Sequence, residues 1–99
     1  MRRFLNPDRE RMIDERVHSE IGRRALKLKF INGMSLLDIS EEVGMVYSTF
    51  TDNYYNKWLP ELFFDFTTSD DGKDFYNDLM DKKGNKRLLK RLMEMITNP

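Results

Sequence analysis

Apolar residues recur at helical spacing through the first third of the chain. They follow one another at intervals of four, four, four and three residues, at Ile13, Val17, Ile21, Ala25 and Leu28. Such a stripe is typical of one face of an α-helix and predicts a helical region over about 7–31, bent or broken near Gly22. Asn6 and Pro7 suit its start, and Asn32-Gly33 suits a left-handed stop.

The same periodicity continues to the end of the chain in shorter segments. Helices are predicted over about 36–43, capped by Ser35 and ended by Gly44, and over about 47–58. Further helices are predicted over 59–66, 74–83 and 85–97, with a loop at 67–72 made of turn-forming and acidic residues. Pro60 is expected to block simple continuation from the helix before it. No stretch alternates like a strand, so the fold class is all-α: a small bundle of about five or six helices in one domain, 1–99, with a helix-turn-helix at about 35–58.

Aromatic residues are concentrated in the middle of the chain. Phe50, Tyr54 and Trp58 are spaced by four, which favours a buried helix face over a surface for stacking nucleic-acid bases. Leu36, Leu37, Ile39 and Val43 are expected to form the buried side of the helix predicted over 36–43. The surplus of apolar residues that follows is a candidate dimer or partner surface: Leu59, Leu62, Phe63 and Phe66.

Charge is unevenly distributed although the chain is neutral overall. Residues 1–30 carry nine Lys or Arg against five acids, a net +4, whereas residues 31–70 carry one against seven, a net −6, and residues 71–99 are +2. A strongly basic DNA-binding domain is not expected to look like this. With no cysteine and no long apolar run, the sequence offers no disulfide, thiolate site or membrane span, and a cytoplasmic location is expected.

Catalytic chemistry is not indicated. The single histidine, His18, lies in a charged segment beside Glu20 and is expected at the surface. The acids between Asp70 and Asp81 lack the spacing of a calcium loop. We therefore expect no enzyme, no metal and no cofactor.

The segment Gly33–Phe50 carries the one functional motif. It places a short helix, a glycine able to adopt positive φ, and the start of a second helix in succession, which is the layout of a helix-turn-helix. The run from Asn32 to Phe50, Asn-Gly-Met-Ser-Leu-Leu-Asp-Ile-Ser-Glu-Glu-Val-Gly-Met-Val-Tyr-Ser-Thr-Phe, resembles the homeodomain-like helix-turn-helix of resolvases, transposases, small phage terminases and many regulators. Its Glu-Glu-Val-Gly and Ser-Thr-Phe parts are more weakly similar to the tetracycline-repressor family. Ser40 stands where the family usually has Ala.

The resemblance implies binding to double-stranded DNA, with the second helix in the major groove. Val46, Tyr47, Ser48, Thr51 and Asp52 would then lie nearest the bases. Thr49, Lys57, Arg2 and Arg3 would hold phosphates. Since Lys57 is the only cation of that helix, other phosphate contacts would have to come from Arg9, Arg23, Arg24 or Lys27.

Two classes of function follow from this pattern. The first is a sequence-specific, homodimeric DNA-binding protein, a small transcriptional regulator of phage, plasmid or bacterial type. The alternative is a protein-interaction module whose acidic, aromatic helices bind a partner such as the transcription machinery. A DNA packaging or recombination accessory is a further possibility within DNA binding.

Overall fold

The computed structural model describes residues 5–65, 68–80 and 94 of the chain. All regular structure in these residues is helical and none is strand, which confirms the all-α class. Contacts between Cα atoms group the chain into two compact units, Leu5–Leu62 and a second unit that contains the residues from Phe63 onward. No helix within the described ranges is long and apolar enough to cross a membrane. The extent of the predicted single domain remains a prediction.

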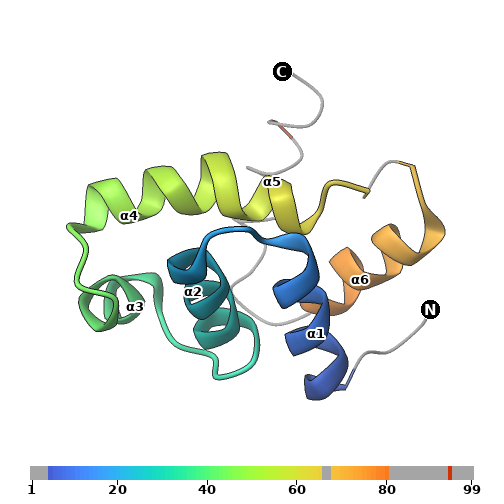
Figure 1. Ribbon diagram of the computed structural model, residues 1–99, viewed down its shortest axis with the longest axis horizontal. Helices are drawn as coiled ribbons and strands as arrows, with labels where there is room; N and C mark the ends of the chain where they lie inside the picture. The colour runs from blue at the N-terminus through green and yellow to red at the C-terminus, as the bar shows by residue number, and fades with distance from the viewer. Residues whose placement is uncertain (1–4, 66–67, 81–93, 95–99) are drawn as a thin grey trace. The chain divides into compact units, whose positions relative to one another are not determined.

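The first predicted helix is in fact two helices. Helix α1 spans Asn6–Arg16 and α2 spans Glu20–Phe30 (Figure 1). The chain leaves the helical conformation at Val17, whose φ and ψ are −101° and 123°, and Ser19 starts α2 by accepting a hydrogen bond from the Gly22 amide at 3.1 Å. The break thus falls at 17–19 rather than near Gly22. Asn6 is the first residue of α1 rather than its cap.

The next two helices form as predicted. Helix α3 spans Leu36–Glu42 and α4 begins at Tyr47 and ends at Asn53. Ser35 caps α3 by accepting from the Asp38 amide at 3.1 Å. Gly33 and Gly44, which end α2 and α3, both have a φ of 73°, the left-handed conformation expected of a helix-stopping glycine.

Helical structure runs on without interruption from α4. A π-helix, η1, spans Tyr54–Trp58, and α5 spans Leu59–Leu62, so that the expected break before Pro60 is absent (Figure 1). Proline removes one amide donor, and its ring crowds the carbonyl four residues earlier. The Leu59 amide donates to the Tyr54 carbonyl, five residues back, and this wider turn accommodates Pro60 within the helix. The predicted helix 59–66 is therefore shorter and continuous with its predecessor.

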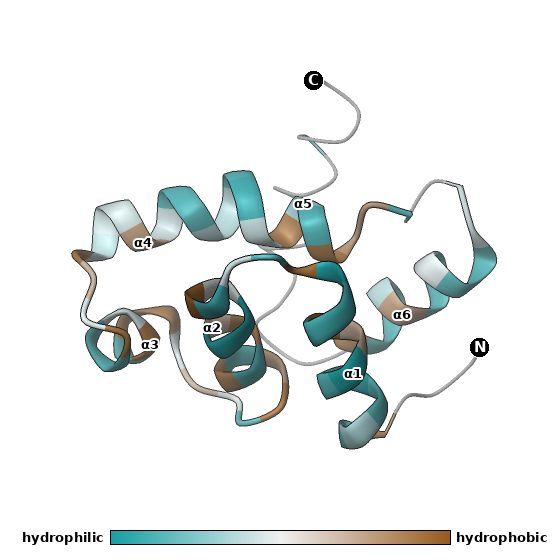
Figure 2. Ribbon diagram, viewed as in Figure 1, coloured by the Kyte–Doolittle hydropathy of each residue, from teal (hydrophilic) through white to brown (hydrophobic). Residues whose placement is uncertain are grey.

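The three earlier helices pack against successive parts of this long helix. Helix α3 contacts α4, α2 contacts η1 and α1 contacts α5, while α2 also contacts α1 and α3. Figure 2 shows that α1 is mostly hydrophilic, and Met12 and Ile13 are its buried residues. The other buried apolar side chains of the unit are Val17, Ala25, Leu26, Phe30, Ile39, Phe50, Tyr54, Trp58, Leu59 and Leu62.

This burial confirms part of the expected core and corrects another part. Phe50, Tyr54 and Trp58 are core residues. The ring centroid of Phe50 lies 5.9 Å from that of Tyr54 and 5.7 Å from that of Trp58. The predicted partner surface is wrong for Leu59, Leu62 and Phe63, because all three are buried; Phe66 lies outside the described residues. Leu37, expected inside, is 53% exposed, and Val43 is only partly buried.

The second unit contains helix α6, which spans Asp70–Met80. It starts four residues earlier than predicted because Ser69 accepts a hydrogen bond from the Gly72 amide at 3.2 Å. A side chain at position 72 would collide with Asp65, so the glycine permits this close approach. Phe63 packs on Phe75 and Tyr76, with ring centroids at 5.7 and 5.0 Å. The predicted helix 85–97 lies outside the described residues except for Glu94, which is helical.

Candidate nucleic-acid interface

A tight turn joins α3 to α4. The Val43 amide donates to the Ile39 carbonyl at 2.9 Å, the Gly44 amide to Glu41 at 3.1 Å, and the Met45 amide to Ser40 at 2.9 Å. These bonds satisfy the last carbonyls of α3, and the left-handed Gly44 turns the chain toward α4. Helix α3 packs on α4 across the turn, and α2 packs on α3. These contacts fix the position of the turn within the unit.

Ser40 fits the crossing of these helices. Its side chain is buried, and its hydroxyl donates to the Leu37 carbonyl at 2.7 Å. A buried hydroxyl is tolerated when it is hydrogen-bonded, and this one is bonded within its own helix. A serine therefore fits this position with little disturbance of packing.

Helix α4 presents its predicted base-contacting residues outward. Phe50 faces the core, whereas Ser48, Thr49 and Asp52 are exposed and Thr51 is partly exposed. At the start of the helix, Val46 is 71% and Tyr47 47% exposed. The structure thus places the predicted residues Val46, Tyr47, Ser48, Thr49 and Asp52 on the accessible surface of the α3–α4 segment, with Thr51 partly exposed.

Two polar side chains on α4 already use a hydrogen-bond donor locally. The Thr51 hydroxyl donates to the Ser48 carbonyl at 3.1 Å, and the Asn53 amide nitrogen donates to the Thr49 carbonyl at 3.1 Å. The side chains of Tyr47, Ser48 and Asp52 make no hydrogen bond to another residue within 5–65 or 68–80. These three have their full hydrogen-bonding capacity available to a ligand.

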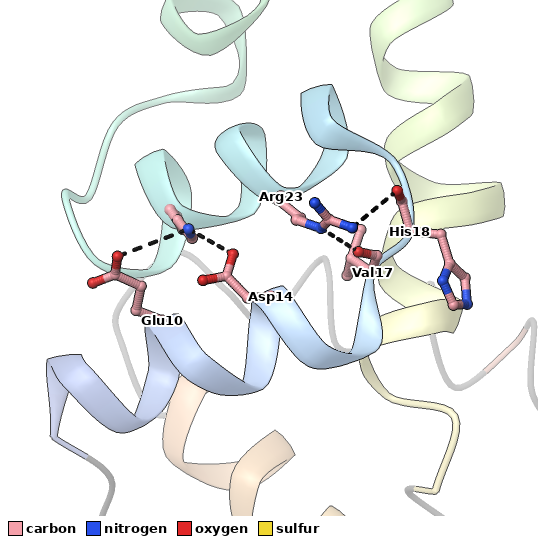
Figure 3. Close-up of polar contacts among 6 residues, drawn as sticks. Glu10, Asp14, Val17, His18 and Arg23 are labelled. Carbon is pink, nitrogen blue, oxygen red and sulfur yellow. Dashed lines mark hydrogen bonds and ion pairs between the residues drawn. The ribbon is translucent and has the colours of Figure 1, made fainter.

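The cations expected to help with phosphate binding are engaged inside the unit. Arg23 donates from Nε to the Val17 carbonyl at 2.6 Å and from a terminal nitrogen to the His18 carbonyl at 3.2 Å (Figure 3). Lys27 lies 2.7 Å from an Asp14 carboxylate oxygen and 3.8 Å from Glu10, in contacts that join α2 to α1. Both residues therefore bind α1 and the α1–α2 connection instead of standing free on the surface.

Arg24 and Lys57 are more accessible. Arg24 pairs with Glu42 of α3 at 2.9 Å, but both side chains are more than half exposed, and exposed pairs contribute only about 0–1 kcal/mol. Such a pair can exchange its carboxylate for a phosphate at small cost. Lys57 is exposed and forms no ion pair with the residues described. Arg9 donates to Asn6 at 3.3 Å, and the predicted Arg2 and Arg3 lie outside the described residues.

Leu37 of α3 was expected to be buried but is exposed. Ile39 and Ser40 are buried, and Leu36 and Val43 share their side of α3 at spacings of three and four residues. Leu37 lies two residues from Ile39 and so faces away from it, which the helical period alone would have indicated. Leu37, Val46 and Tyr47 give the α3–α4 segment three exposed apolar or aromatic side chains.

Other candidate chemistry is sparse in the described residues. No three His, Asp or Glu side chains among them gather in a way that could hold a metal ion. His18 is exposed at the surface, 3.9 Å from Glu61. No protein-family model, curated protein or solved structure matches this chain.

Proposed function

We propose that the Leu5–Leu62 unit binds double-stranded DNA through its helix-turn-helix, with α4 in the major groove. The observation that carries the proposal is the outer surface of α4, where Tyr47, Ser48 and Asp52 are exposed and free to hydrogen-bond beside a braced turn. A recognition helix needs such side chains near its N-terminal end, since that end reaches the base edges. The resemblance of the Asn32–Phe50 run to homeodomain-like helix-turn-helix proteins supports the same function.

In this proposal the contacts divide by chemistry. Val46 can meet the methyl group of a thymine, while Ser48 and Asp52 reach polar base edges. Thr49 and Lys57 contact phosphates, joined by Arg24 after exchange of its Glu42 partner and by Arg2 and Arg3 in the adjacent minor groove. Because one weakly basic helix reads few base pairs, we propose a homodimer that binds two half-sites.

The biological role proposed with this chemistry is transcriptional regulation. A small regulator of phage, plasmid or bacterial type, acting in the cytoplasm, would use a single helix-turn-helix per protomer in this way. Its affinity would depend on sequence-specific contacts more than on phosphate attraction, because few cations are free.

A protein-interaction module is the second candidate, and the engaged cations favour it. Residues 31–65 carry Lys57 as their one cation against six acids, and Arg23 and Lys27 are held by internal contacts. A surface with exposed Leu37, Val46 and Tyr47 beside acidic side chains suits a basic, partly apolar protein partner.

Salt-dependent DNA binding separates these candidates. The full chain is used to enrich a pool of randomised duplexes, and affinity for the enriched duplex is measured by fluorescence anisotropy from about 50 to 200 mM salt. We expect log affinity to fall linearly with log salt, and Lys57→Ala to reduce that slope by about one unit. Lys73→Ala, an exposed lysine of α6, is the matched control and should leave the slope unchanged.

Two results would contradict the proposal. If no duplex is enriched or bound at about 50 mM salt, the helix-turn-helix does not bind DNA under conditions that favour phosphate contacts. If Lys73→Ala lowers the slope while Lys57→Ala does not, DNA binds away from α4.

A further inference from the structure

The centre of the exposed face of α4 is occupied by an acid. Each residue turns an α-helix by about 100°, so Ser48 and Asp52, two positions on either side of Phe50, both point roughly 160° away from it. Phe50 is fully buried, whereas Ser48 and Asp52 are exposed. These two residues, four apart, therefore form the ridge of α4 that is farthest from the core.

No cation of the described residues neutralises this acid. The Asp52 carboxylate forms no ion pair with another residue of these ranges, and Lys57, the next cation along the helix, is five residues away across the change to π-helix. An unpaired carboxylate on the ridge that enters a groove repels phosphates and every base-edge acceptor. It lowers affinity for DNA in general unless a base offers it a donor.

We propose that Asp52 is the specificity-determining residue of the interface, and that its carboxylate accepts a hydrogen bond from the N4 amino group of a cytosine in the major groove. This inference rests on the proposed DNA binding. A carboxylate only accepts hydrogen bonds, and in the major groove guanine offers the acceptors N7 and O6 while thymine offers O4. Adenine presents its N6 amino donor beside the acceptor N7, which repels a carboxylate. Cytosine presents its N4 amino donor with no acceptor of its own beside it, so it is the base that suits Asp52 best.

The same geometry predicts a separation of affinity from specificity. Removing the charge at Asp52 abolishes the selective hydrogen bond but also removes the repulsion from all other DNA. General affinity should therefore rise while discrimination falls. A residue whose only role is to stabilise the fold would change neither quantity in this way.

The test uses the full chain and the duplex enriched by it. Four duplexes are compared by anisotropy, each with a different base pair at the position where enrichment selects cytosine. The wild type is expected to bind the cytosine duplex about tenfold more tightly than the others. Asp52→Ala is expected to bind all four within about twofold of one another, and more tightly than the wild type binds the three unfavoured duplexes.

Two further variants make the result specific. Glu41→Gln removes an exposed acid of α3, off the α4 ridge, and should raise affinity for all four duplexes equally while keeping the preference for cytosine. Asp52→Asn keeps the shape of the side chain but adds a donor, so its preference should move toward adenine. Thermal melting of each variant establishes that it is folded.

The outcomes distinguish this inference from the function beneath it. Enrichment of a duplex without a selected cytosine, or an undiminished cytosine preference in folded Asp52→Ala, overturns the role of Asp52 and leaves DNA binding standing. Absence of any duplex binding by the wild type overturns both.

Discussion

Gly22 lies directly beneath the indole ring of Trp58, and replacing it with alanine should destabilise the protein. A Cβ at position 22 would stand 2.6 Å from Cδ1, 2.7 Å from Nε1 and 2.8 Å from Cγ of Trp58. Carbon atoms in good contact are about 3.5–4.0 Å apart. The three atoms belong to one rigid ring that is only 3% exposed, so the indole cannot swing into solvent to make room.

The sign of this effect opposes the usual effect of the substitution. Glycine to alanine in a helix ordinarily stabilises by about 0.5–1 kcal/mol. Forcing a methyl group into a filled core costs about 1–3 kcal/mol. We expect Gly22→Ala to lower the free energy of unfolding by about 1–2 kcal/mol, and each such kcal/mol lowers Tm by roughly 4–8 °C in a domain of this size.

Urea unfolding followed by helical circular dichroism measures this change, and the fluorescence of Trp58, the only tryptophan, reports on its environment. Glu15→Ala, at an exposed position of α1, is the control for a substitution by alanine that introduces no clash. In a Trp58→Leu background the smaller side chain leaves space, so Gly22→Ala should cost less there than in the wild type. The reasoning is refuted if Gly22→Ala raises the urea midpoint of the wild type, or if its cost is the same in both backgrounds.

Four further predictions concern the core and the helix ends. The buried hydroxyl of Tyr54 has no hydrogen-bond partner among the described residues, so Tyr54→Phe should raise Tm and increase the free energy of unfolding by up to about 1–3 kcal/mol; a lower Tm would show that the hydroxyl is bonded. Burial, and secondarily the charge of Tyr55, raises the pKa of Tyr54 in the folded protein. The free energy of unfolding should therefore fall as pH rises above about 10, because Tyr54 ionises there in the unfolded chain but not in the folded one. Urea titrations at about pH 9–11 should show a smaller loss in Tyr54→Phe. Gly44→Ala should cost about 1–2 kcal/mol because φ is 73°, and Gly44→Asn should cost less; equal urea midpoints for the two variants would contradict the left-handed turn. Ser19→Ala should cost about 1 kcal/mol by removing the cap of α2, whereas Ser19→Asp should retain it; an unchanged midpoint in Ser19→Ala would show that the cap contributes nothing.

Features that depend on a few neighbouring residues were predictable from the sequence. The caps at Ser35, Gly33 and Gly44 follow from local chemistry, and the structure places all three as expected. The spacing of Phe50, Tyr54 and Trp58 likewise identified the core face of α4 and η1. The exposed residues 46–49 and 52 could be named because the position of Gly44 fixes where the second helix begins.

Features that depend on tertiary packing were not predictable in the same way. Ile13, Val17 and Ile21 keep a spacing of four across the break at 17–19, so the apolar stripe imitates one long helix, although Ile21 is in fact 46% exposed. The pairing of Lys27 with Asp14 exists only because the chain folds back at that break, and charge counting gave no sign of it. At Pro60, packing of α1 and α2 against α5 and η1 favours a continuous helix where local propensity favours a stop.

The unbroken helix 47–62 has a mechanical consequence. Its sixteen residues span roughly 24 Å at the rise of an α-helix, and α3, α2 and α1 contact it in that order from the turn to its far end. There, a guanidinium nitrogen of Arg16 donates to the Leu62 carbonyl at 3.1 Å and so fastens α1 to the end of α5. Because the helix is held along its whole length, we expect the direction of α4 to be set by the same contacts that stabilise the core.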